Sequence, residues 1–229
     1  MDINLLDIVV AAIIIFFAVK GYFSGFVKMC FSFIPQIMGI VAAYLLTPTI
    51  SHILRGTFIY GILKNGVNKA LNIDSAVAVT GGQKDVIETL NVPSFLKDSL
   101  MENNNPVVYD LLDASGIGEY ISGYIANVCV NIIALILVFA VTYLIFKVIL
   151  EALDIMTRLP VVSTLNSCGG IVAGVCCGVF VVWLAGIVMV LFYSSAFFAP
   201  VFEKLYESRL ALPLYENNML LFMVLKIFA

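Results

Sequence analysis

Four long apolar stretches dominate the pattern of hydrophobic and polar positions along this chain. They lack the two-residue or 3.6-residue alternation of a soluble surface element. A helix needs about 20 predominantly apolar residues to cross a bilayer. We therefore predict an all-α, polytopic membrane protein, a single membrane domain with four transmembrane helices over about residues 5–23, 29–46, 122–150 and 168–193.

Proline and charge indicate where these helices end. Pro35 lies inside the second span, and Thr47-Pro48 is expected to end it. The third helix is expected to continue past the bilayer to Arg158, before a Leu159-Pro160 turn. Pro200 is expected to stop the fourth span.

The one large hydrophilic region, residues 49–120, contains no run of spanning length. Within it, residues 83–91 and 93–101 carry apolar positions at helical spacing, which predicts two short amphipathic helices. Helices this short rarely hold in water alone. We expect them to lie on the membrane surface or to cap the helix bundle.

Composition agrees with this class, because 62% of the residues are hydrophobic and only 12% are charged. The lipid bilayer is thus the expected environment. A net charge of −3 without a basic cluster excludes a nucleic-acid partner. No Lys or Arg precedes the first apolar run, so we interpret it as a retained span and not as a signal peptide.

Basic residues in the short loops predict the orientation. Lys20 and Lys28 flank the first loop, and Lys147 and Arg158 flank the third. Short loops rich in Lys and Arg face the cytoplasm. We expect an inner-membrane protein whose loops near 20–28 and 151–167 are cytoplasmic, with both termini and residues 49–120 outside.

Three polar residues fall within or at the edge of the apolar stretches. Asp7, in the first turn of the first span, either faces water and complements the helix dipole or is an intramembrane carboxylate with a partner on another helix. Asn127 and Asn131 are four residues apart on the third helix. They either form hydrogen bonds between helices or join a polar stripe.

Glycines recur at fourfold spacing in both halves of the chain. Gly21 and Gly25 follow the first span, and Gly170, Gly174 and Gly178 form a seam along the fourth. Such spacing lets another backbone approach closely and indicates helix packing, not a chemical activity. Each half has a helix, a charged turn with Gly or Pro and a return helix with early glycines, which suggests a duplication.

The tip between the third and fourth helices carries charge. Asp154 and Arg158 are an i,i+4 pair, and Asn166 follows the turn. Exposed pairs of this kind contribute only about 0.2–0.5 kcal/mol. They are either a solvated helix end or a polar mouth or partner-docking tip.

Motifs for catalysis are absent from the sequence. The single His52 has no Ser or Cys beside it at motif spacing, and no phosphate-binding loop is present. No His, Cys and carboxylate set has metal-ligand spacing. We therefore expect no catalytic residues, no metal and no cofactor, and we do not expect an enzyme.

The order and spacing of several short motifs resemble the colicin V production protein (CvpA) family. They are Asp7 before an apolar helix, Gly21-Tyr22-x-x-Gly25-Phe26, the stretch from Asp154 through Leu159-Pro160 and Leu165-Asn166 to Gly178, and the tail from Ser208-Arg209-Leu210 to Asn217-Asn218. Ser167 departs from the pattern, since the family often has a basic residue there. The resemblance implies an inner-membrane protein linked to colicin V production or export and to envelope homeostasis.

Two functions from different classes follow. The first is a membrane protein that acts by oligomeric assembly or solute permeation, in which four spans offer so little room that a pore needs a homo-oligomer. The second is a scaffold that transports nothing and docks export or envelope machinery through residues 49–120.

Overall fold

The computed structural model of this chain describes residues 4–79, 82–152, 164–193, 195 and 197–226. Every regular element within those ranges is a helix. Four of them are long and apolar enough to span a membrane: α1 (Leu5–Ser24), α2 (Phe26–Arg55), α8 (Ile117–Ala152) and α10 (Thr164–Leu191). The prediction of an all-α, multi-pass membrane protein is confirmed.

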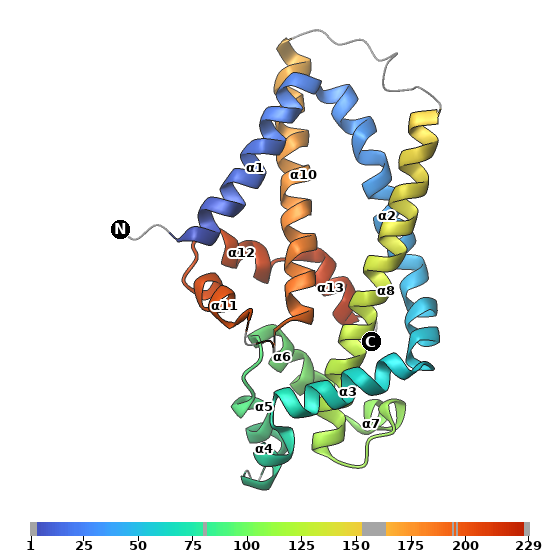
Figure 1. Cartoon of the computed structure of the whole chain (residues 1–229), viewed down its shortest axis with the longest axis vertical. Coiled ribbons are helices and arrows are strands. Elements are labelled where there is room, and N and C mark those ends of the chain that lie inside the picture. Colours follow the sequence, from blue (N-terminus) through green and yellow to red (C-terminus); the bar gives the residue numbers. More distant parts are fainter. Residues whose placement is uncertain (1–3, 80–81, 153–163, 194, 196, 227–229) are drawn as a thin grey trace.

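The long helices form two pairs (Figure 1). Helix α1 packs on α10, and α2 packs on α8, although the members of each pair are far apart in the sequence. Helices α1 and α2 are separated by Gly25 alone, so the chain reverses direction within one residue. The topology therefore brings the two halves of the chain together along their lengths.

Short helices gather at the end of the molecule opposite this turn (Figure 1). The two amphipathic helices predicted in residues 83–101 are confirmed as α5 (Gln83–Thr89) and α6 (Ser94–Glu102). Their apolar faces are buried. The other short helices are α3 (Phe58–Ala70), α4 (Ile73–Val79), α7 (Pro106–Leu112), α11 (Ala199–Tyr206), α12 (Ala211–Glu216) and α13 (Met219–Lys226).

The first half of α8 is the centre of the core. Every residue from Tyr120 to Ile132 is buried. The Tyr120 hydroxyl donates a hydrogen bond to the Leu100 carbonyl at 2.7 Å, and its ring stacks on that of Tyr109 with centroids 4.7 Å apart. Helices α6 and α7 are thus fixed to α8.

Two predicted helix ends are wrong. Helix α2 continues through Pro48 to Arg55. Its packing against α8 offsets the free energy lost with the backbone hydrogen bond that a proline cannot make. Helix α10 ends at Leu191, well before Pro200. Pro200 instead lies in the first turn of α11, where the missing N–H costs nothing.

Helix α1 begins beside α11 and α12, and the α1–α2 turn lies at the end of the molecule opposite α3–α7, with the last described turn of α8 (Figure 1). Which end faces the cytoplasm stays a prediction.

Candidate functional site

Glycines bring the backbones of α1 and α10 into direct contact. A Cβ atom added to Gly21 would lie 1.9 Å from the Gly170 carbonyl oxygen, and one added to Gly174 would lie 2.2 Å from the Phe17 carbonyl oxygen. At Gly178 the nearest atom, the Ile14 Cα, would be 2.9 Å away. Since all these neighbours are backbone, no side chain fits in this crossing.

Gly25 and Asn166 form the turn between α1 and α2. Gly25 has a φ of +77°, a conformation that L-residues with a side chain rarely adopt. The Asn166 amide of α10 lies against it, and the Val27 N–H donates to the Asn166 Oδ1 at 3.1 Å. Asn166 therefore caps the first turn of α2 from a different helix.

The other end of α1 is attached to the C-terminal helices. The Asp7 carboxylate accepts hydrogen bonds from the Ser208 hydroxyl and from the N–H groups of Arg209, Leu210 and Ala211. Asp7 thus caps the start of α12, and its partner is a backbone segment and not a charged side chain.

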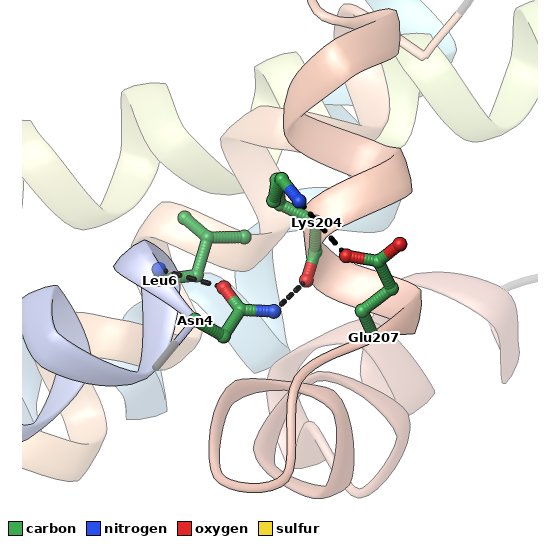
Figure 2. Close-up of polar contacts among 4 residues, drawn as sticks. All are labelled: Asn4, Leu6, Lys204 and Glu207. Carbon is green, nitrogen blue, oxygen red and sulfur yellow. Dashed lines mark hydrogen bonds and ion pairs between the residues drawn. The ribbon is translucent and has the colours of Figure 1, made fainter. Parts of the chain in front are cut away.

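A second contact lies beside it. Figure 2 shows Asn4, whose Oδ1 accepts from the Leu6 N–H at 2.9 Å while its Nδ2 donates to the Lys204 carbonyl. The Lys204 ammonium pairs with the Glu207 carboxylate at 2.9 Å. The start of α1 is therefore held by α11 and by the segment that leads into α12.

Two asparagine side chains in α8 are buried without a partner. Asn127 and Asn131 are both 0% exposed, and no described atom forms a hydrogen bond with either amide. A buried polar group left in this state costs about 1–3 kcal/mol. These are the least satisfied polar side chains within the long helices.

The antiparallel pairing of α2 and α8 predicts that further polar residues lie near them. Gly39 of α2 lies against Phe139 of α8. Four-residue steps along both helices from that contact predict Thr47 at the level of Asn131, and Ser51 at the level of Asn127. Thr47 and Ser51 are buried, and the Thr47 hydroxyl also lacks a partner in the part of the chain that the structure describes. We name these four residues the polar row.

The C-terminal helices dock on α10 through another asparagine. The Asn218 amide donates to the Trp183 carbonyl at 2.8 Å and accepts from the N–H groups of Leu220 and Leu221. Gly186 provides the space, with the Asn218 Nδ2 3.2 Å from where its Cβ would lie. Burial raises the pKa of the neighbouring Tyr215 phenol above its usual range.

The structure brings some of the predicted site residues together and separates others. Gly21 meets Gly170, and Gly25 meets Asn166, so the glycines of the two halves face each other. Asn127 and Asn131 lie on another helix, apart from this crossing. Asp154 and Arg158 lie outside the described residues.

Sequence reasoning missed the partners of these residues. Thr47 and Ser51 lie on either side of Pro48, which suggested a helix end, and Ser208 lies in a segment whose contact with Asp7 spans 201 residues. The four-residue spacing of Thr47 and Ser51, equal to that of the two asparagines, was the one available signal.

No metal site is evident, since no group of three or more His, Cys, Asp or Glu residues lies together within the described ranges. The five cysteines are free thiols. The arrangement supports helix packing and polar contact between helices.

Comparison with known protein families assigns the chain to one of them. The model of the family described as colicin V production protein matches residues 6–81 and 112–218. Searches of curated proteins and of solved structures returned no match. The match covers the four long helices and most of the chain, so the protein belongs to the colicin V production protein family.

Proposed function

We propose that this chain acts in the inner membrane as a subunit of a homo-oligomer that takes part in colicin V production or export and in envelope homeostasis, and that this assembly lets a polar solute pass. The observation that carries the proposal is the pair of buried, unpartnered amides of Asn127 and Asn131. Polar side chains inside a membrane are costly, and they commonly mark the path of a solute.

The polar row supplies hydrogen-bonding groups at the interface of α2 and α8. Two carboxamides and a hydroxyl have unused donors and acceptors there. A solute moving between the two helices would satisfy them. Movement of α2 against α8 would open such a path while the α1–α10 crossing stays closed.

The outer surface of the helices supports assembly. One face of α1 packs on α10, and the other is exposed and apolar, so it is free to contact lipid or a second copy; it includes Ile8, Ile15, Phe16 and Val19. Four spans leave little room for a path within one chain, which is why several copies are proposed.

The proposed orientation places the loops near 20–28 and 151–167 in the cytoplasm, with both termini and residues 49–120 outside. In this orientation Asn166, together with Asp154 and Arg158, belongs to a cytoplasmic tip. Labelling of single cysteines from each side of the membrane tests the orientation, and a cytoplasmic location for residue 100 would contradict it.

The permeation proposal is tested with purified protein in lipid vesicles. We expect ion or small-solute flux for the wild-type chain and a large loss of flux for the double variant Asn127→Leu/Asn131→Leu, which keeps the branched arrangement of heavy atoms and removes the amides. Asn65→Leu is the matched control, because Asn65 is exposed on α3. No flux of any solute under any gradient, or full flux in the double variant, would overturn the proposal.

A second candidate function is a scaffold for export or envelope machinery. Two pairs of apolar side chains at i,i+4 spacing favour it: Phe58 and Ile62 of α3 are 78% and 62% exposed, and Val107 and Leu111 of α7 are 67% and 66% exposed. Exposed apolar pairs outside the long helices fit a partner protein or a lipid surface.

The scaffold is tested with surface variants. Replacing residues 83–101 as a block is unsuitable, because Val86, Leu96 and Leu100 are buried. We instead expect Val107→Gln/Leu111→Gln to abolish complementation of colicin V production in cells and to leave vesicle flux unchanged. Normal complementation by this variant and by Phe58→Gln/Ile62→Gln would exclude docking through these pairs.

A further inference from the structure

A cleft opens between the long helices near the α1–α2 turn. It has a volume of about 270 Å³ and is lined by residues of α1, α2, α8 and α10. Its polar lining includes Lys20, Gln36, Tyr143, Lys147 and Glu151. It is separate from the polar row, which lies nearer the opposite end of α8.

Two lysines from different helices face this cleft. Lys147 pairs with Glu151 at 3.9 Å, and both side chains are more than half exposed, so the pair is weak. Lys20 has no carboxylate within 4 Å among the described residues, and its ammonium lies 5.9 Å from the centre of the Phe17 ring. The cleft therefore has an excess of positive charge.

The lining also offers an uncharged donor. The Tyr143 hydroxyl forms no hydrogen bond with any other described residue. Two ammonium groups and a phenol that converge on one small cleft suit the oxygen atoms of a phosphate.

The depth of the cleft matches that of lipid headgroups. Lys20 is four residues from the end of α1 at Ser24, and Lys147 lines the same cleft from α8. At about 1.5 Å per residue, Lys20 lies about 6 Å below the helix end. That is the scale of the headgroup layer, since a bilayer of about 40–45 Å contains a hydrocarbon core of about 30 Å.

An exposed apolar stripe runs along α8 from beside the cleft toward the middle of the helix. Val148, Leu144, Val141 and Leu137, at three- and four-residue spacing, are 63%, 57%, 50% and 48% exposed. Acyl chains of a lipid whose headgroup occupied the cleft would cover them. A free phosphate has no acyl chains and would leave these apolar side chains uncovered.

We propose that the cleft binds one anionic phospholipid, with the phosphate between Lys20 and Lys147, the Tyr143 hydroxyl as a donor, and the acyl chains along α8. The proposal is independent of the permeation function, because it uses none of the residues in the polar row.

The test measures the thermal midpoint of the purified protein in detergent during titration with phosphatidylglycerol or phosphatidylcholine. A ligand that binds only the folded state raises this midpoint. We expect phosphatidylglycerol to raise it at a lower mole fraction than phosphatidylcholine does. Each of Lys20→Gln and Lys147→Gln should weaken the apparent affinity for phosphatidylglycerol about fivefold. The reason is that each basic residue near an anionic surface contributes a similar amount to the binding free energy.

Controls separate charge from folding and lipid from free anion. Lys84→Gln, at the opposite end of the molecule, should leave the titration unchanged, and Lys20→Arg/Lys147→Arg should restore it if the glutamine variants lose it. Equal effects of the two lipids, or full phosphatidylglycerol affinity in the Lys20→Gln/Lys147→Gln variant, would overturn the proposal. Inorganic phosphate that reproduced the shift alone would overturn the assignment to a lipid.

Discussion

In the α1–α10 crossing glycines place backbone against backbone, whereas the α2–α8 crossing is filled by side chains and contains amides without partners. The first arrangement excludes water and has no atom that can rotate away. The second keeps unused hydrogen-bonding capacity and meets a flexible ring at its one glycine contact, Gly39 with Phe139. We therefore call α1–α10 the fixed crossing, because no side chain can move there to make room for added volume.

The largest expected effect is at the fixed crossing. Gly174→Ala would place a methyl group 2.2 Å from the Phe17 carbonyl oxygen, so the two helices must separate. We expect a loss of about 3 kcal/mol in unfolding free energy, at the upper end for overpacking. Thermal denaturation in detergent measures it, with Gly61→Ala on α3 as the control because a Cβ there meets nothing within 4 Å. Equal stability of the two variants would refute the description of a rigid seam.

The next effect has the opposite sign. Asn127→Leu and Asn131→Leu each remove a buried amide that has no partner among the described residues, and keep its branched arrangement of heavy atoms. We expect each to raise the unfolding free energy by about 1–3 kcal/mol, the cost of leaving such a group unpaired. A decrease in stability would mean that the amides hold α2 and α8 together. The α2–α8 pair would then be held by specific contacts, as the α1–α10 pair is.

A smaller loss is expected at the end of the fixed crossing. Asn166→Ala removes the cap that α10 provides to α2 at Val27. We expect a loss of about 1 kcal/mol, typical of an N-cap substitution. The exposed Asn65→Ala on α3 serves as control in the same denaturation assay. A variant as stable as the control would show that Gly25 forms the turn without help from α10.

The smallest effect is expected where α2 meets α8. Gly39→Ala would bring a methyl group 2.7 Å from a ring carbon of Phe139, a side-chain atom that can be displaced without separating the two backbones. We expect a loss below about 1 kcal/mol. Phe139→Leu should relieve it, and a double-mutant cycle measures that coupling. A loss as large as that of Gly174→Ala would show that both crossings are equally rigid.

The helix content and the number of long apolar helices followed from the sequence, because about 20 successive apolar residues have few alternatives to a membrane helix. Helix ends were less predictable. Pro48 marks a stop in an isolated helix, but α2 continues to Arg55 because it packs on α8 along its length. Pro200 is predicted to end α10, and it instead lies in the first turn of α11.

For the candidate site, the sequence indicated which glycines and polar residues are of interest. It did not indicate which residues they contact. The glycine spacing indicated close approach of some backbone, yet nothing local showed that Gly21 would meet Gly170. Asp7 left two interpretations open, and its partner is a segment 201 to 204 residues away. Such pairings depend on how helices associate and leave no periodic pattern in the chain.

The sequence by itself determined the membrane class, the four long helices and the positions where small or polar residues interrupt them, because hydropathy and helical spacing are local properties. The tertiary structure alone decided that α1 pairs with α10 and α2 with α8. It also decided that Asn166 caps a distant helix and that Asn127 and Asn131 are buried without partners. The physical reason is that packing and hydrogen-bond satisfaction depend on neighbours across the bundle, which an apolar helix of given composition does not specify.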